Sequence, residues 1–296
     1  MTAVRMRGVT KRYGDVTALD AVSLELRENT IHGLLGRNGA GKTTIMQILT
    51  GQNVETAGQV EVLGEHPYEN ARVLDRVCFI REAQRYPDGY RVRDALRAAA
   101  ILFPSWDAAF AAELVEDFAL RPKQGIKKLS RGQLSAVGVI IGLASRAPLT
   151  FFDEPYLGLD AVARQLFYDR LLADYAEHPR TVVLSTHLID EVSDLIEHVV
   201  VVDRGRVVID EDADVLRGRA VTVTGPTAAV QAFAAGYTEL HREQLGGFLR
   251  VTLQGAGPDP RLRAEGLEFE PVSLQQLVVR TTQQARGDLH DRKVAV

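Results

Sequence analysis

The alternation of apolar and polar residues near the N-terminus predicts a small antiparallel sheet followed by a buried strand. Residues Ala18 to Leu26 alternate between the two classes, as a half-buried strand does, and a turn is expected at Tyr13 to Asp15. The mostly apolar run Ile31 to Leu35 leads into a glycine-rich turn, after which a helical pattern begins near Lys42. We therefore expect a strand, a loop and a helix in direct succession.

Short apolar runs between longer helical segments predict a parallel sheet. Strands buried on both faces read as near-continuous apolar runs, and helices commonly connect parallel strands. Such runs occur at Val77 to Ile80, Leu149 to Phe152, Val182 to Ser185 and Val199 to Val202. From about Pro87 to Ala144 the sequence has a helical pattern and is rich in alanine, which predicts a helical lobe inserted between strands. Asp203 to Arg206 is expected to turn a hairpin.

The chain is expected to divide into two domains and a tail. Its 296 residues suggest about two domains, and the composition shifts toward Gly, Pro and Thr after about Arg217. Between Ala220 and Glu270 the pattern reads strand, helix, strand, strand, helix, strand, as in a ferredoxin-like module. Ser273 and Gln276 have capping-box spacing and are expected to open a last helix. The predicted boundaries are 1–216 (helical subdomain about 87–145), 217–284 for a small α/β module and 285–296 for a mobile tail.

Composition and charge argue against several classes of protein. Hydrophobic residues make up 46% and charged residues 25%, as in a globular protein. The formal net charge of −4 argues against a general nucleic-acid binder, so no nucleic-acid partner is expected. The one cysteine, Cys78, cannot form an internal disulfide, and the N-terminus lacks the apolar stretch of a signal peptide. The uncharged run between Arg131 and Arg146 is too short for a membrane span, so a cytoplasmic chain is expected.

The segment Gly36 to Thr44, GRNGAGKTT, carries the strongest chemical signal. It fits the pattern G-x-x-x-x-G-K-[ST] and follows an apolar strand. Glycines let successive backbone N–H groups turn toward a phosphate, and the following helix directs the positive end of its dipole at the same charge. Lys42 would reach the β- and γ-phosphates, and Thr43 would place its hydroxyl on Mg²⁺. The expected nucleotide contacts are Gly36, Asn38, Gly39, Gly41, Lys42, Thr43 and Thr44.

A second signal is the segment Leu149 to Pro155, LTFFDEP, an apolar strand that ends in two carboxylates. Asp153, at the carboxyl end of the strand, is expected to bind Mg²⁺ directly or through water. Glu154 is expected to orient or deprotonate an attacking water. Beside the phosphate loop, this pair indicates a catalytic site more than a helix cap or a solvated strand end.

With a third segment the sequence resembles the nucleotide-binding subunits of ABC transporters. Leu129 to Gln133 reads LSRGQ and lies upstream of the two carboxylates, where that family usually has LSGGQ. Ser130 begins a helical run, so its hydroxyl and nearby N–H groups form an anion site, while Ser130 and Gln133 also fit a capping box. Arg131 replaces the first glycine and leaves Ser130 and Gly132 for the γ-phosphate. We therefore expect Arg131→Gly to leave activity broadly intact.

The resemblance spans about Val4 to Asp210 and implies further roles. Tyr13 matches the aromatic residue that stacks on adenine, and His187 matches the switch histidine that contacts the γ-phosphate. Leu157 to Asp160, LGLD, looks like the loop that communicates between paired sites, with Asp160 at its end. The implied fold is an α/β P-loop NTPase with a RecA-like core, an antiparallel β subdomain and an inserted helical subdomain, followed by the small C-terminal α/β module.

One position departs from the family pattern. The family places a glutamine after the strand around Phe79, where it touches Mg²⁺ and the water, whereas this segment reads FIREAQRYPD. Glu82 occupies that position with a shortened loop, or Gln84 reaches in from further along. We favour Glu82 from its distance to the strand. A carboxylate there would still bind the metal, but it would add negative charge beside Asp153 and Glu154.

The resemblance also implies cofactors, partners and location. ATP and Mg²⁺ are the expected cofactors, with Lys42, Glu154 and His187 in catalytic roles. In this family the signature segment of one subunit completes the ATP site of the other, so catalysis is expected to require a homodimer or a heterodimer with a second ABC ATPase. The chain is expected to hydrolyse ATP for a separate membrane-spanning permease, on the inner face of the cell membrane. Its architecture looks like that of bacterial ABC-2 exporters.

Two other functions remain open at this point. A soluble ABC-type ATPase could act on the ribosome or DNA, although the sequence has neither a second cassette with a charged linker nor a long coiled coil. A regulatory subunit could bind ATP with little turnover. Glu154 and His187 argue against that role, and the departure at the glutamine position argues for it.

Overall fold

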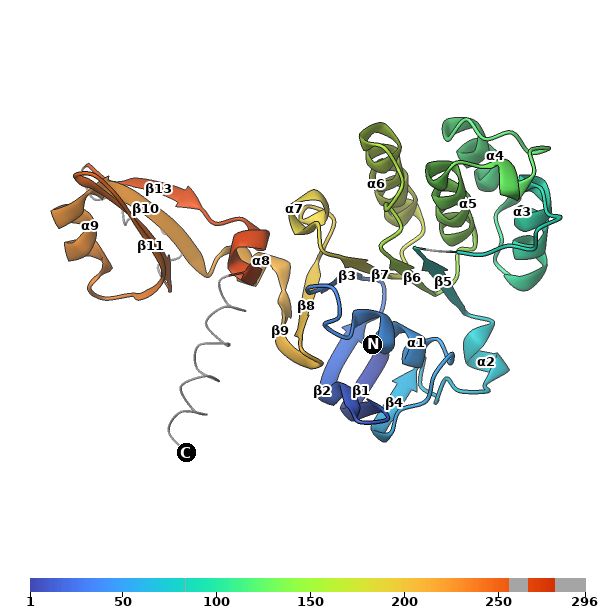
Figure 1. The fold of residues 1–296 in the computed structure, drawn as a ribbon, viewed down its shortest axis with the longest axis horizontal. Coiled ribbons are helices and arrows are strands. Elements are labelled where there is room, and N and C mark those ends of the chain that lie inside the picture. The colour runs from blue at the N-terminus through green and yellow to red at the C-terminus, as the bar shows by residue number, and fades with distance from the viewer. Residues whose placement is uncertain (83, 256–265, 280–296) are drawn as a thin grey trace. The chain divides into compact units, whose positions relative to one another are not determined.

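The computed structural model describes residues 1–82, 84–255 and 266–279 (Figure 1). By their contacts these residues group into two compact units, one of Met1–His187 with Val200–Val207, the other of Leu188–Val199 with the residues from Val208 onward. The domain boundary expected at residue 216 remains a prediction.

A six-stranded sheet contains the predicted apolar runs. Its strand order is β5-β6-β7-β3-β8-β9, and β5 through β3 pair in parallel, with Arg81 beside Asp153 and Leu35 beside Thr186. Every residue of β3, β6 and β7 is buried, as expected for strands covered on both faces. The strands are β3 (Ile31–Leu35), β5 (Val77–Arg81), β6 (Leu149–Asp153), β7 (Thr181–Thr186), β8 (His198–Asp203) and β9 (Arg206–Asp212).

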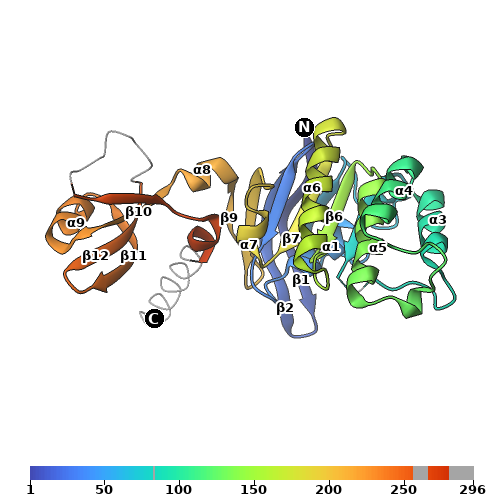
Figure 2. The same cartoon turned by 90° about the horizontal axis from the view of Figure 1, so that it is seen from above.

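The antiparallel sheet predicted near the N-terminus packs on one face of the parallel strands. It has the order β2-β1-β4, formed by β1 (Thr2–Tyr13), β2 (Val16–Arg27) and β4 (Ala57–Val62). Helix α1 (Lys42–Leu49) lies on this side, and α5 (Arg131–Ala144) with α6 (Ala161–Glu177) lies on the other (Figures 1 and 2). The parallel strands therefore form the middle layer of three.

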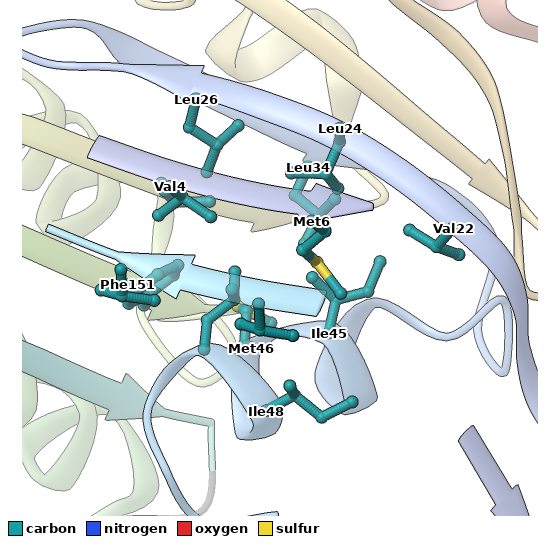
Figure 3. Packing of buried hydrophobic residues seen from close by; sticks show 14 of the residues in the cluster. Val4, Met6, Val22, Leu24, Leu26, Leu34, Ile45, Met46, Ile48 and Phe151 are labelled. Atoms are coloured by element: carbon teal, nitrogen blue, oxygen red, sulfur yellow. The ribbon is translucent and has the colours of Figure 1, made fainter. Parts of the chain in front are cut away.

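The main hydrophobic core fills the space between the antiparallel sheet, α1 and the parallel strands. Met6 and Leu24 point into it from the antiparallel sheet, Ile45 and Met46 from α1, and Phe151 from β6 (Figure 3). These side chains are almost fully buried. The core holds α1 against the end of β3, and this fixes the position of the loop that joins them.

A helical lobe follows β5, as the alanine-rich segment predicts. Its helices are α3 (Val92–Leu102), α4 (Ala108–Asp117), the short 3₁₀ helix η1 (Ile126–Lys128) and α5. Asp107 caps α4 by accepting a hydrogen bond from the Phe110 N–H at 2.8 Å. Two short helices lie outside this lobe, α2 (Ala71–Leu74) before β5 and α7 (Ile189–Val192) after β7.

The second unit contains a four-stranded antiparallel sheet of order β11-β12-β10-β13. Strand, helix, strand and strand follow one another as predicted, and apolar residues of α9 and β12 share a small core. The second helix of the predicted module and the tail at 285–296 fall mostly or wholly outside the described residues. Residues 274–279 are helical, and the Ser273 hydroxyl accepts from the Gln276 N–H at 3.2 Å. The elements are α8 (Ala213–Arg217), β10 (Ala220–Pro226), α9 (Thr227–Ala234), β11 (Thr238–Leu245), β12 (Phe248–Gln254) and β13 (Glu268–Pro271).

Helices in the described parts of the chain are short or polar. Across residues 1–82, 84–255 and 266–279, none combines the length and the apolar character that a membrane crossing requires.

Candidate nucleotide-binding site

The glycine-rich loop joins β3 to α1 at the carboxyl edge of the parallel sheet. Gly36 has φ 147° and Gly41 has φ 113°, conformations that a side chain disfavours. Helix α1 begins directly after Gly41, and no side chain of the described residues caps it. Its first N–H groups are therefore left to bind an anion, as the sequence predicts.

Gly36 lies so close to strand β8 that no side chain fits. A Cβ atom built there would lie 2.2 Å from the carbonyl oxygen of Val202. We expect Gly36→Ala to displace the loop, lower stability by about 1–3 kcal/mol and weaken nucleotide binding. Thermal unfolding and nucleotide titration measure both effects. Gly89→Ala is the matched control, because a Cβ there meets no atom within 4 Å; an equal loss in both variants would contradict the steric explanation.

Lys42 is a buried cation at the base of the cleft. Its Nζ donates to the carbonyl oxygen of Gly36 at 2.7 Å and lies 3.9 Å from Oε1 of Glu154. Burial lowers the pKa of Lys42, and the charges of Glu154 and Asp153 oppose that shift. The lysine is therefore held among oxygen atoms, at the start of α1 where a phosphate would bind.

Asp153 and Thr43 place two oxygen-bearing side chains beside the lysine. The Thr43 hydroxyl donates to Oδ2 of Asp153 at 2.9 Å, across 110 positions of sequence. Asp153 is the last residue of β6, and burial raises the pKa of its carboxyl while the hydrogen bond from Thr43 lowers it. Carboxylate and hydroxyl oxygens are suitable ligands for Mg²⁺, so this pair fits the metal that the sequence predicts.

Glu154 is held in place by three neighbours, Tyr156, Ser185 and His187. Its φ of 51° is unusual for a non-glycine residue, and its N–H donates to the Ser185 carbonyl at 3.1 Å. Nδ1 of His187 lies 2.9 and 2.8 Å from the two carboxylate oxygens. The Tyr156 hydroxyl donates to the same carboxylate and also contacts the Thr186 hydroxyl. The carboxylate is therefore oriented from two sides.

Tyr156 is the functional candidate that sequence reasoning missed. It lies two residues after Glu154 and is buried, and burial followed by its hydrogen bond to Glu154 raises the pKa of its hydroxyl. An aromatic residue directly after the DEP segment is the only sequence signal for it. Its hydroxyl therefore remains protonated at neutral pH and serves as a donor to the carboxylate.

Lys42, Thr43, Asp153, Glu154 and His187 line one cleft of about 330 Å³, whereas Gly36 and Tyr156 lie outside its lining. It brings together ten predicted site residues from the glycine-rich loop, the start of α1 and the ends of β5, β6 and β7, namely Asn38, Gly39, Gly41, Lys42, Thr43, Thr44, Glu82, Asp153, Glu154 and His187. Ala18, Ala40 and Leu157 also line it. None of the three was named as a site residue from the sequence, although Ala40 lies in the glycine-rich segment and Leu157 in the LGLD segment. Of the two alternatives for the family's glutamine, Glu82 lies in the lining; the Gln84 side chain instead accepts a hydrogen bond from the Arg81 N–H at 3.4 Å.

The other predicted site residues lie outside this cleft. Tyr13 ends β1, is 46% exposed and hydrogen-bonds through its hydroxyl to Asn53. Ser130 accepts from the Gln133 N–H at 3.2 Å, and Gln133 accepts from the Ser130 N–H at 3.1 Å. This is the predicted capping box of α5. Asp160 caps α6 by accepting from the Ala163 N–H at 2.8 Å.

A parallel sheet with a glycine-rich loop, a buried lysine and strand-end carboxylates defines a P-loop NTPase. A sequence model described as ABC transporter matches residues 19–157. The chain is 32% identical over 213 residues to the Nod factor export ATP-binding protein I of Cupriavidus metallidurans, covering 70% of each chain. It is 33% identical over 210 residues to the aliphatic sulfonates import ATP-binding protein SsuB 1 of Nocardia farcinica, covering 70% of this chain and 81% of the relative.

Solved structures show the same fold. A dimeric bacterial ABC transporter cassette superposes with a TM-score of 0.62 at 21% identity, covering 71% of this chain and 98% of the cassette. The chain belongs to the family of ABC transporter ATP-binding proteins, which confirms the resemblance seen in its motifs.

Proposed function

We propose that this chain binds and hydrolyses ATP, and that it thereby energises transport through separate membrane-spanning permease subunits. The observation that carries the proposal is the cleft in which Lys42, Asp153 and Glu154 meet at the start of α1. The cation and the backbone N–H groups suit the triphosphate, one carboxylate suits its metal, and the other suits the attacking water. Family membership supports the coupling to transport.

Each cleft residue has a role that its position supports. The N–H groups from Gly36 to Thr44 and the Lys42 ammonium hold the phosphates in place. Mg²⁺ would be held by Thr43 and Asp153, with Glu82 as a further carboxylate at the rim, and would neutralise charge on the phosphates. Positioning and electrostatics do most of the work in phosphoryl transfer, so these contacts account for much of the expected rate.

Glu154 is suited to orient the attacking water and to accept its proton. Its carboxylate lies at the cleft and is already hydrogen-bonded by His187 and Tyr156. His187 is 39% exposed at its side chain, so it can contact the γ-phosphate as well as the carboxylate. The two neighbours hold the carboxylate in the orientation that it needs to accept a proton from the water. Hydrolysis by this route involves no covalent enzyme intermediate.

Removing the Tyr156 hydroxyl tests this positioning. Tyr156→Phe keeps the buried ring but removes one charge-assisted hydrogen bond to Glu154, so we expect the hydrolysis rate to fall about tenfold with ATP affinity unchanged. Steady-state kinetics and nucleotide titration separate the two quantities. Tyr175→Phe is the control, since that hydroxyl donates to the Asn29 carbonyl, away from the cleft. A loss of affinity equal to the loss of rate would instead assign Tyr156 to binding.

A complete site is proposed to need two chains. Ser130 and Gly132 lie outside the cleft lining of their own chain, so they are available to the nucleotide of a second copy or of a similar ABC ATPase. Tyr13, exposed at the end of β1, is proposed to stack on adenine, and Asp160 with its loop to communicate between the paired sites.

Export is the proposed direction of transport, with the chain held at the inner face of the membrane by its permease. A single cassette followed by a small α/β unit resembles ABC-2 exporters, and one relative is named for Nod factor export. The sulfonate import relative is equally similar, so the permease itself has to be identified. We expect a tagged Glu154→Gln chain, purified with ATP from detergent-solubilised native membranes, to retain a polytopic membrane protein in stoichiometric amount. Recovery of ribosomes or DNA instead would favour a soluble ATPase.

A further inference from the structure

The two residues that depart from the family's motifs contact each other. Arg131 stands where the signature usually has glycine, and Glu82 is the residue we favour over Gln84 for the position where the family usually has glutamine. Nη2 of Arg131 lies 2.7 Å from Oε1 of Glu82, although 49 positions separate them in sequence. The side chains are 69% and 43% exposed, so the pair lies at the rim of the cleft.

Neither residue suits its position without the other. Arg131 is the first residue of α5, where the helix dipole disfavours a cation by about 0.3–1 kcal/mol. The capping box of Ser130 and Gln133 already satisfies this helix end, so the arginine adds nothing to it. The Glu82 carboxylate offsets the unfavourable charge.

Glu82 on its own would crowd the cleft with negative charge. Strand β5 pairs in parallel with β6, and Arg81 lies beside Asp153, so Glu82 leaves the sheet at the same edge as Glu154. The cleft lining then holds three carboxylates, Glu82, Asp153 and Glu154, against the single ammonium of Lys42. An uncompensated third carboxylate would repel the phosphates of a nucleotide.

The backbone near Arg131 is closely packed. A Cβ at Gly158 would lie 2.8 Å from Cγ of Arg131, and a Cβ at Gly132 would lie 2.5 Å from the Gly158 carbonyl. The Ser135 hydroxyl also donates to the Leu157 carbonyl at 2.7 Å. The stem of Arg131 therefore lies against the loop after β6, while its guanidinium reaches the loop after β5.

We propose that Arg131 is a positioning residue for Glu82. Its guanidinium neutralises the Glu82 carboxylate and holds it at the rim, so the cleft accepts a nucleotide although it carries a carboxylate where the family usually has an amide. This inference rests on the proposed ATP site. It also replaces the expectation that Arg131→Gly is neutral, because loss of the arginine leaves Glu82 without this partner.

A double-mutant cycle tests the proposal. The four proteins are the parent, Arg131→Ala, Glu82→Gln and the double variant, and the measurement is the affinity for a non-hydrolysable ATP analogue with Mg²⁺. We expect Arg131→Ala to weaken binding about three- to tenfold when Glu82 is present, and less than about twofold in the Glu82→Gln background. The same loss in both backgrounds would overturn the proposal, because it would mean that Arg131 contacts the nucleotide directly.

A charge control and a second readout complete the test. Lys128→Ala removes an exposed positive charge three positions before Arg131 in the sequence, and we expect it to leave affinity within about twofold of the parent. Urea unfolding of the four proteins without nucleotide should show a coupling of about 1.5- to fivefold in the unfolding constant.

The two readouts separate this inference from the proposed function. If the parent binds no nucleotide, the ATP site fails, and the unfolding cycle alone supports or overturns the ion pair. If the parent binds nucleotide but both cycles are additive, the ATP site stands and the role of Arg131 is overturned.

Discussion

Replacing Lys42 with alanine is expected to weaken nucleotide binding by about one to two orders of magnitude. The ammonium is buried at the start of α1 and already bonds to oxygen atoms of the loop, so it can donate to phosphates without reorganisation. A charge-assisted hydrogen bond contributes about 1.5–3 kcal/mol, which corresponds to about a 10- to 150-fold loss of affinity. Hydrolysis should fall at least as far. Isothermal titration with ATP and a phosphate-release assay measure the two effects.

Lys123→Ala is the control for this experiment, because Lys123 is an exposed lysine outside the cleft. It should bind and hydrolyse ATP as the parent does. If Lys42→Ala keeps the parent's affinity while its thermal unfolding is also unchanged, the cleft described here is not the nucleotide site.

Replacing Glu154 with glutamine is expected to separate binding from hydrolysis. The amide keeps the size of the side chain but cannot accept a proton from water, and general base catalysis contributes about 10²- to 10⁴-fold. We therefore expect hydrolysis to fall by at least about 100-fold while ATP still binds. Because hydrolysis would no longer open the nucleotide sandwich, the variant should accumulate as a dimer with ATP. Size-exclusion chromatography with light scattering, with and without ATP, measures this.

Glu177→Gln provides the matched control, because it makes the same change at an exposed position at the end of α6. It should remain at the parent's rate and oligomeric state. A Glu154→Gln protein that hydrolyses ATP at the parent's rate would remove the proton-accepting role from Glu154.

The sequence predicted the phosphate loop and the strand-end carboxylates because local rules govern both. A glycine-rich loop between a buried strand and a helix can be read from adjacent residues, and the carboxyl ends of parallel strands meet at one edge. Because the strand ends meet at one edge, Thr43 and Asp153 come within hydrogen-bond distance of each other, although 110 positions separate them. It also brings His187 to Glu154, from the end of β7.

Contacts that depend on side-chain direction could not be predicted in this way. Tyr156 is a single aromatic residue in a loop, where no periodicity indicates whether it points inward. The left-handed backbone of Glu154 is likewise invisible in sequence, since glycine is the residue that usually marks such a conformation. The contact between Arg131 and Glu82 depends on how the helical lobe rests on the sheet, which no local pattern specifies.

The contact between Arg131 and Glu82 also constrains how this sequence can drift over generations. A lineage that loses only one of the two charges passes through a protein with an unbalanced group at the cleft rim, whereas a lineage that loses both returns to a neutral pair. Selection should therefore favour paired changes at these positions. We expect positions 82 and 131 to covary among descendants of this chain, with arginine found where the other position is acidic.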